Sequence, residues 1–114
     1  MKFSLPLKLV NSTNVREHWS KRARRAKEQR GLAKMFTANS WTMLQQIQHF
    51  GTYEVKITRI GKRLMDDDGV QASAKNVRDG IADALQVDDG DLGLIRFSYA
   101  QRLGKSYAVE IEII

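Results

Sequence analysis

Residues 68–85 read DGVQASAKNVRDGIADAL, and their apolar positions decide how the chain packs. The apolar side chains recur at spacings of four, three, four and four, which is one face of an amphipathic helix: Val70, Ala74, Val77, Ile81 and Leu85. Asp68 stands at the expected N-cap position, and Gln71 follows three residues later, as in a capping box. This pattern predicts one helix of about 17 residues with a buried face.

Strands are predicted on both sides of this helix, because apolar and polar residues alternate with the period of two that a half-buried strand requires. The alternation covers residues 3–9, 53–58, 95–99 and 107–113. Pro6 lacks an N–H group, so we expect the first strand at an edge of the sheet. The last two strands are joined by a short connection, and we expect them to form a hairpin.

A second helical segment is predicted over residues 15–48, with room for a break near residues 37–40. The resulting order, β-α-β-α-β-β, predicts an α+β fold: a small mixed sheet of about four strands with two or three helices on one face. A chain of 114 residues is long enough for one such domain, and we expect residues 1–114 to form it.

Charge is divided unevenly along the chain. Residues 1–64 carry fourteen Lys and Arg against three Glu, whereas residues 65–114 carry five against ten acids. A basic half favours a polyanion as partner, nucleic acid above all. The chain has no cysteine, which excludes disulfides, thiolate metal sites and cysteine nucleophiles. With no apolar run of transmembrane length and no signal peptide, we expect a cytoplasmic protein without a membrane partner.

The basic residues of the first half gather in the predicted helix over residues 15–48. The candidate DNA-binding residues there are Arg16, His18, Lys21, Arg22, Arg24, Arg25, Lys27 and Arg30. Only Glu17 and Glu28 interrupt this series, so the helix would present one sign of charge over about five turns, enough to follow a phosphate backbone. A solvated surface without a ligand is the alternative, because most charge runs on helices are only that.

Eight aspartates and no glutamate lie between Asp66 and Asp91. The first acidic cluster, residues 66–68, directly precedes the predicted helix of residues 68–85. Adjacent carboxylates repel one another unless a positive charge neutralises them. In an extended segment Asp66 and Asp68 point the same way, which would place both on one hard divalent cation. Capping of the helix by Asp68 is the alternative, and it explains one aspartate but not three.

The second acidic cluster, residues 88–91, follows the C-terminal end of the same helix. Negative charge opposes the helix dipole there unless a cation or a basic partner answers it, although Asp-Gly is also an ordinary turn sequence. A helix of this length would hold the two clusters about 25 Å apart, so a shared site requires a shorter helix or a returning loop. Between them, Lys75 could approach a bound phosphate, whereas we expect Asp83 to belong to an exposed salt-bridged stripe.

Several other chemistries are disfavoured. A calcium loop of the EF-hand type would place Leu64 and Lys75 at its first and twelfth positions, and neither residue can ligate calcium. No Ser-His-Asp or Cys-His set, phosphate-cradling glycine loop or zinc spacing is present. Acyl transfer and nucleoside triphosphate hydrolysis are therefore poor hypotheses.

The run of residues 64–91 resembles the RusA-like family of phage and prophage Holliday-junction endonucleases. The features that carry the resemblance are Asp66-x-Asp68 ahead of a helix, a lysine in that helix, Asp79-Gly80-Ile81, and the paired Asp88-Asp89. The basic stretch around His18-Trp19 is similar to the family's N-terminal region. One departure is Gly69, which stands where the family has an asparagine.

This resemblance implies that Asp66, Asp68 and Asp89 bind Mg²⁺ and that Lys75 completes the catalytic set. Asp88 stays open as the alternative to Asp89. The resemblance also implies a homodimer that cuts branched DNA at four-way junctions during recombination and repair. Such a protein would work inside a bacterial host cell and be encoded by a phage or prophage.

Three functional hypotheses follow. The first is a Mg²⁺-dependent, structure-specific endodeoxyribonuclease that resolves four-way (Holliday) junctions. The second is a catalytically impaired DNA-binding phage accessory protein with the same fold, whose activity was lost through Gly69. The third is an interaction module whose acidic loop docks a basic partner.

Overall fold

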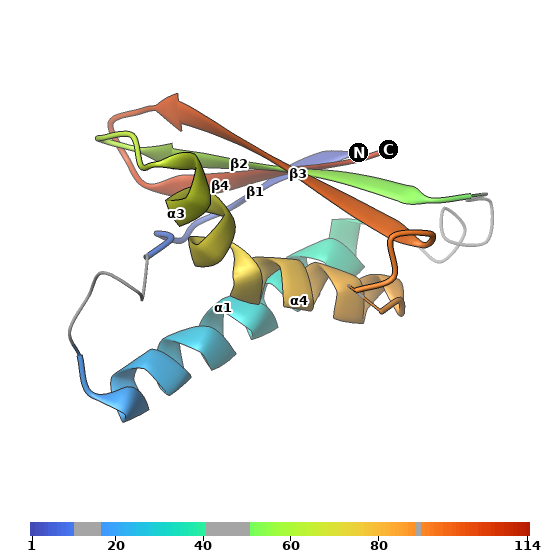
Figure 1. Cartoon of the computed structure of the whole chain (residues 1–114), viewed down its shortest axis with the longest axis horizontal. Helices are drawn as coiled ribbons and strands as arrows, with labels where there is room; N and C mark the ends of the chain where they lie inside the picture. Colours follow the sequence, from blue (N-terminus) through green and yellow to red (C-terminus); the bar gives the residue numbers. More distant parts are fainter. Residues whose placement is uncertain (11–16, 41–50, 89) are drawn as a thin grey trace.

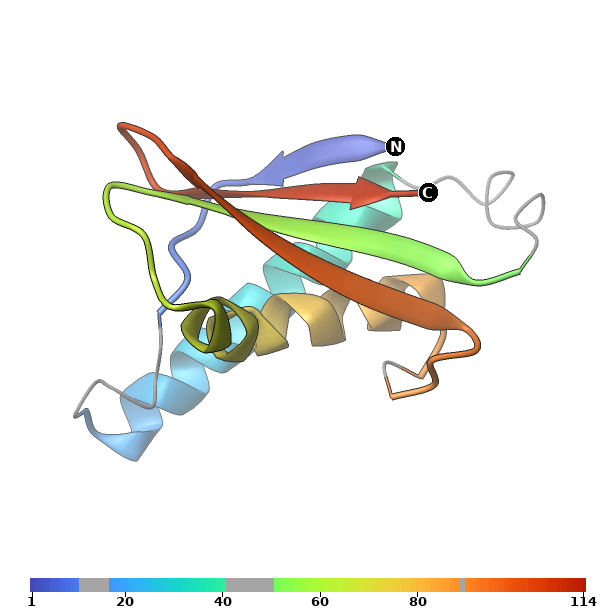
Figure 2. The same cartoon turned by 45° about the horizontal axis from the view of Figure 1, so that its top comes forward.

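The computed structural model describes residues 1–10, 17–40, 51–88 and 90–114. Its elements, in chain order, are β1 (Lys2–Leu5), α1 (Trp19–Ser40), β2 (Tyr53–Gly61), α3 (Asp67–Ser73), α4 (Lys75–Leu85), β3 (Ile95–Leu103) and β4 (Ala108–Ile113). A four-stranded mixed sheet forms one layer, and the helices cover one of its faces (Figures 1 and 2). The α+β class and the position of the helices are confirmed.

The predicted helix of residues 68–85 is two helices, which is the first correction. Ala74 separates α3 from α4 with φ −88° and ψ −1°. Just before it, the buried Ser73 satisfies its hydroxyl by donating from Oγ to the carbonyl of Val70 at 2.9 Å, a local bond that competes with regular helix geometry. The predicted apolar stripe is nevertheless correct, because all five of its side chains are buried.

The strands lie in the order β1-β4-β2-β3. β2 and β3 are parallel, and α3 and α4 form the crossover between them, as parallel neighbours require. β4 pairs antiparallel with both β1 and β2. β1 ends at Leu5, before Pro6, and it is an edge strand as predicted.

The predicted hairpin of the last two strands is wrong, since β2 lies between β3 and β4. The chain crosses the end of β2, where the amide of Gly104 donates to the carbonyl of Gly61 at 3.0 Å. A Cβ on Gly104 would lie 2.6 Å from Cγ2 of Ile60, so only glycine allows this close crossing. The crossing carries β4, whose alternate side chains are fully buried, to the part of the sheet beside β1, which α1 contacts.

The core lies between the sheet and the helices, and α1 and α4 pack closely against each other. Gly80 marks their contact: a Cβ there would lie 2.8 Å from Cβ of Ala33 and would also collide with the carbonyl of Arg30. α1 begins at Trp19, so the predicted helix of residues 15–48 is wrong at residues 17 and 18, which precede α1. α1 is continuous to Ser40, and residues 15, 16 and 41–48 lie outside the described residues. None of the helices in the described part of the chain is long and apolar enough to cross a membrane.

Candidate functional site

The first acidic cluster lies at the start of α3. Asp66 is the N-cap residue, with extended angles of φ −62° and ψ 152°, while Asp67 and Asp68 form the first helical turn. The prediction that Asp68 caps the helix is therefore wrong, and so is the extended geometry expected through Asp68. The Asp66 side chain makes no capping hydrogen bond, and all three residues are exposed. Within the described residues, no ion pair or side-chain hydrogen bond engages these carboxylates.

The second acidic cluster forms turns. Oδ1 of Asp88 accepts a hydrogen bond from the amide of Gly90 at 2.9 Å, and Oδ1 of Asp91 accepts one from the amide of Gly93 at 2.9 Å. These are Asx-turns, in which an aspartate side chain takes the place of a backbone acceptor. The turn interpretation thus accounts for Asp88 and Asp91. Asp89 lies outside the described residues.

The two clusters are not brought together in the described structure. The loop that carries Asp88 and Asp91 follows α4 and leads into β3, whereas Asp66 precedes α3 at the other end of the two consecutive helices (Figures 1 and 2). Among the residues that the structure describes, no three His, Cys, Asp or Glu side chains group so that they could hold a metal ion. Of the three predicted metal ligands, Asp66 and Asp68 are thus the two that lie within the described residues.

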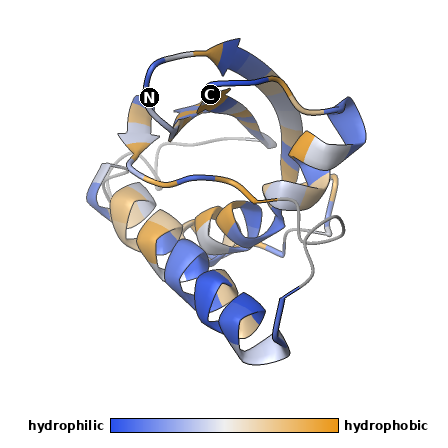
Figure 3. Cartoon of the chain, turned by 90° about the vertical axis from the view of Figure 1, so that its left-hand side faces the viewer, coloured by the Kyte–Doolittle hydropathy of each residue, from blue (hydrophilic) through white to orange (hydrophobic). Residues whose placement is uncertain are grey.

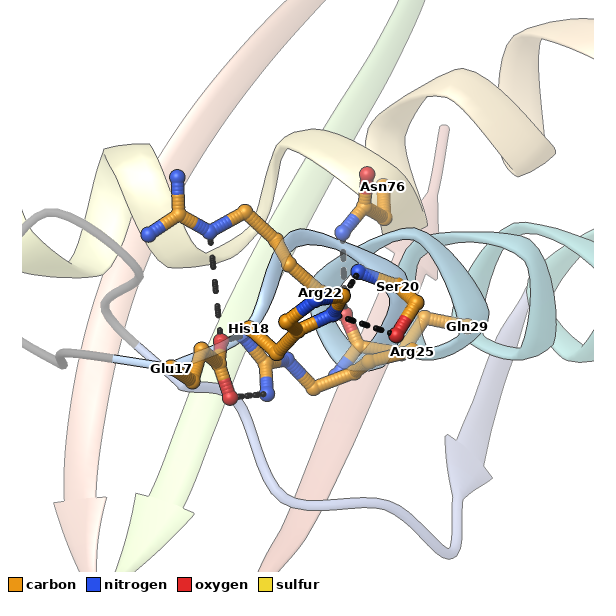
Figure 4. Close-up of polar contacts among 7 residues, drawn as sticks. All are labelled: Glu17, His18, Ser20, Arg22, Arg25, Gln29 and Asn76. Carbon is orange, nitrogen blue, oxygen red and sulfur yellow. Dashed lines mark hydrogen bonds and ion pairs between the residues drawn. The ribbon is translucent and has the colours of Figure 1, made fainter.

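Lys75 is the first residue of α4 and is exposed. It begins the helix that follows the α3 turn, seven residues beyond Asp68 in sequence. Its neighbour Asn76 contacts α1: Nδ2 of Asn76 donates to Oε1 of Gln29 at 3.4 Å (Figure 4). Gln29 is buried, and its Nε2 donates to the carbonyl of Lys8 at 3.1 Å. One side chain therefore holds the middle of α1 against both the start of α4 and the segment after β1.

His18 lies directly before α1, and its hydrogen bonds go to the first turn of that helix. Its Nδ1 accepts a hydrogen bond from the amide of Ser20 at 3.2 Å and lies 2.7 Å from Oγ of the same serine. Its carbonyl accepts the first helical hydrogen bonds, from the amides of Lys21 and Arg22. His18 is therefore an N-cap residue, a role that the capping preferences of Ser, Thr, Asp and Asn would not have predicted.

Arg25 is committed to an ion pair inside the chain. Its Nη1 donates to Oε2 of Glu17 at 3.0 Å, and its Nη2 donates to Oε1 of the same carboxylate (Figure 4). The hydrogen bond from Arg25 lowers the pKa of Glu17, and the same bond raises the pKa of Arg25. Arg22 lies at the edge of this pair, with Nε 3.9 Å from Oε1 of Glu17. A bidentate pair of this kind holds the start of the helix and leaves Arg25 a poor DNA contact.

Arg30 is committed in the same way, across two helices. Its Nε and Nη2 donate to the two carboxylate oxygens of Asp83 at 2.7 and 3.0 Å, which joins α1 to α4. The hydrogen bond from Arg30 lowers the pKa of Asp83. We expected Asp83 in a salt-bridged stripe along its own helix. The salt bridge exists, but its partner is on the neighbouring helix.

The remaining candidate cations of α1 face outward. Lys21, Arg24 and Lys27 are exposed, and none of the three forms an ion pair within the described residues. Figure 3 shows that α1 is hydrophilic in its N-terminal half and more hydrophobic toward its C-terminal end. We call the exposed side of this N-terminal half, with Lys21, Arg24 and Lys27, the outer face of α1. Arg16, the first of the predicted DNA-binding residues, lies outside the described residues.

Arg59 is a buried cation that the charge patterns did not single out. It is only 5% exposed, and its Nη1 donates to the carbonyl of Arg63 at 2.7 Å and to Oε1 of Gln101 at 3.4 Å. Gln101 in turn accepts from the amide of Met65 and donates to its carbonyl, each at 2.7 Å. Together these bonds hold the loop that precedes Asp66. The alternation of the strand could have predicted that Arg59 is buried, because Arg59 lies on the same face of β2 as Ile57.

The chain is similar to one curated protein. Over 81 residues it is 37% identical to an uncharacterized protein of Xylella fastidiosa (strain Temecula1 / ATCC 700964), and the match covers 68% of this chain and 52% of that protein. The chain thus spans about half the length of the relative it matches. No family model matches the chain, and no solved structure matches it.

Proposed function

We propose that this protein is a Mg²⁺-dependent, structure-specific endodeoxyribonuclease that cuts four-way junctions in DNA, as the RusA-like resemblance of residues 64–91 implies. The observation that carries the proposal is the first acidic cluster: three neighbouring carboxylates at the start of α3 that make no cap and no ion pair within the described residues. Adjacent carboxylates repel one another, and a bound cation would remove this repulsion.

The donor set fits magnesium. Mg²⁺ is usually held by one or two carboxylates and keeps several waters, so Asp66 and Asp68 would be enough ligands from one chain. Since the two residues do not lie in one extended segment, their exposed side chains would have to turn toward the same ion. The bound ion would orient a water nucleophile and stabilise the charge that develops on the phosphate. The resemblance adds Asp89 as a third ligand, with Asp88 as the alternative.

The other parts of the chain would position the DNA. The outer face of α1 would contact the phosphate backbone through Lys21, Arg24 and Lys27, which form no ion pair within the described residues. Lys75 would offset negative charge on a phosphate bound near Asp68. The hydrogen bond from Asn76 to Gln29 joins the start of α4 to α1. The resemblance further suggests a homodimer in the cytoplasm of a bacterial host, encoded by a phage or prophage.

Cleavage of a synthetic four-way junction tests this proposal. In Mg²⁺, the protein is expected to nick the junction and to leave linear duplex of the same sequence intact. Asp68→Asn should abolish nicking but keep junction binding, because the substitution removes a ligand charge from an exposed position. Asp67→Asn is the matched control, since it removes a neighbouring charge that is not among the proposed ligands, and it should retain nicking.

A second candidate is a DNA-binding protein of the same fold without catalysis. It is favoured by the second acidic cluster, where Asp88 and Asp91 are engaged in turns at the other end of the helix pair. Gly69, in place of the family's asparagine, points the same way. Intact junction binding with no nicking in either Mg²⁺ or Mn²⁺ would replace the first proposal with this one.

A further inference from the structure

Tyr107 lies at one end of the sheet, next to two lysines from separate segments of the chain. Nζ of Lys8 lies 4.5 Å from the centre of its ring, and Nζ of Lys62 lies 5.9 Å from the same point. Lys8 follows β1, Lys62 lies in the loop between β2 and α3, and Tyr107 lies in the loop between β3 and β4 (Figure 1). The fold therefore brings two ammonium groups to one aromatic ring, an arrangement that cation–π attraction supports.

The charge at this end of the sheet is not balanced locally. Residues 6–10, 59–65 and 101–109 contain six Lys and Arg and no Asp or Glu. Arg102 pairs with Glu110, but Lys8, Lys62 and Lys105 are exposed and form no ion pair within the described residues. Arg59 adds a buried guanidinium, whose Nη1 donates to a carbonyl and to an amide oxygen. Cations held together in this way favour an anionic partner.

The same residues are tied to the candidate site. Lys62 precedes Asp66 by four residues, in the loop that Gln101 holds through Met65. Lys8 is held by its carbonyl, which accepts a hydrogen bond from Gln29 of α1. In Figure 2 the loops that carry Lys62 and Tyr107 lie at the same end of the sheet as the N-terminal half of α1, and the loop of the second acidic cluster lies at the opposite end.

We propose that Lys8, Lys62, Lys105 and Tyr107 form a second contact site for the phosphate backbone of nucleic acid, separate from the outer face of α1. We call it the Tyr107 surface. Its ligand is recognised by charge along a polyanion and not by base sequence. The proposal rests on the proposed function for the choice of branched DNA, in which one arm would lie along α1 and another along the Tyr107 surface, with Asp66 and Asp68 between them.

Binding measured without cleavage tests the Tyr107 surface. The intact protein is titrated onto a fluorescent four-way junction in EDTA at several salt concentrations, and anisotropy gives the affinity. Each phosphate contact contributes about 0.9 to the slope of log K against log salt. The double variant Lys8→Gln/Lys62→Gln should therefore lose between one and two units of slope and bind roughly tenfold more weakly at 0.15 M salt.

The matched control is Lys2→Gln/Lys56→Gln, which removes two exposed lysines from the strands β1 and β2 instead. It makes the same change in net charge and should keep the parent's slope. Tyr107→Phe should also bind like the parent, because it retains the ring. Circular dichroism and thermal unfolding would show that each variant is folded.

The outcomes separate the two proposals. Equal losses of slope in the two double variants would overturn the Tyr107 surface, since net charge alone would then explain them. An unchanged slope in Lys8→Gln/Lys62→Gln would overturn it as well, even if junction nicking in Mg²⁺ is normal. A selective loss in that variant, in a protein that binds junctions but never nicks them, would support the Tyr107 surface and refute the nuclease.

Discussion

At the scale of single residues, Gln86 ends α4 in the left-handed region, with φ 58° and ψ 41°. Its amide donates to the carbonyl of Asp83, and the amide of Val87 donates to the carbonyl of Ala82, so the turn closes the helix in the manner of a Schellman motif. Glycine is the residue that most often occupies this position, because a Cβ is strained there. Gln86 is exposed and therefore contributes little packing in return.

Gln86→Gly is expected to raise the free energy of unfolding by about 0.5–1 kcal/mol, because it removes the left-handed strain. The control is Gln71→Gly, at an exposed position inside α3, where glycine should lower stability by about 1 kcal/mol. Urea unfolding followed by circular dichroism measures both. A destabilised Gln86→Gly variant would show that the glutamine side chain has a role that its exposure hides.

The stability of the folded chain in acid also depends on single residues. Hydrogen bonds from Arg25, Arg30 and Arg102 lower the pKa values of Glu17, Asp83 and Glu110 in the folded chain. A carboxylate with a lowered folded pKa binds protons more readily when unfolded. Its contribution is therefore complete above the unfolded pKa of about 4, and it is lost as the pH falls through the lower folded value.

Because Arg30 lowers the pKa of Asp83, a variant without this carboxylate should lose less stability than the parent as the pH falls. Asp83→Asn should be less stable than the parent at pH 7, and the difference should shrink as the pH falls below about 4. Arg30→Gln should lose the same acid dependence, and the double variant should add nothing further, because both residues act through one pair. Urea midpoints between pH 2.5 and 7 give the comparison. A difference that stays constant across this range would contradict the assignment.

At the scale of elements, the stripe pattern of residues 70–85 predicted the buried face of the helices but not their division at Ala74. Periodicity reports which side of a helix is buried, and it is unaffected when one residue departs from helical angles. Beside the break, the buried hydroxyl of Ser73 donates to a carbonyl within its own turn. The sequence did not predict the close contact between α1 and α4 either. That contact is shown by Gly80, where an added Cβ would lie 2.8 Å from Cβ of Ala33.

Gly80→Ala is expected to lower the free energy of unfolding by about 1–3 kcal/mol, because the new methyl group meets the backbone of α1. Gly31→Ala is the matched control: it lies in α1, and a Cβ there has no neighbour within 4 Å. That substitution should raise stability by about 0.5–1 kcal/mol, since alanine favours the helix. Chemical unfolding measures the stability of the two variants. Similar midpoints would contradict the prediction and would mean that α1 and α4 separate easily at Gly80.

At the scale of the whole molecule, the basic surfaces lie toward the same end of the fold as the first acidic cluster. The outer face of α1 and the Tyr107 surface lie toward one end, and the loop of the second acidic cluster lies at the other (Figure 2). Among the predicted DNA-binding residues, the structure divides those that face solvent from those already paired. Lys27 is of the first kind and Arg25 of the second.

This division predicts unequal effects of substitutions that change the net charge equally. Lys27→Gln should reduce the slope of log K against log salt for duplex DNA by about 0.9, the value for one phosphate contact. Arg25→Gln should leave the slope nearly unchanged and lower stability instead, because it breaks the pair with Glu17. Salt titrations at constant pH measure the slopes. A larger loss in Arg25→Gln would mean that Arg25 leaves Glu17 when DNA binds.

The sequence by itself determined the α+β class, the edge position of the first strand, the buried stripe, and the separation of basic and acidic halves. These properties follow from local periodicity, from proline chemistry and from composition, which need no knowledge of distant contacts. Only the tertiary structure decided that β4 inserts beside β2, that Arg25 and Arg30 are paired, and that Lys8 and Lys62 meet at Tyr107. Each of these depends on segments far apart in the chain, whose contacts are selected by burial of the common core.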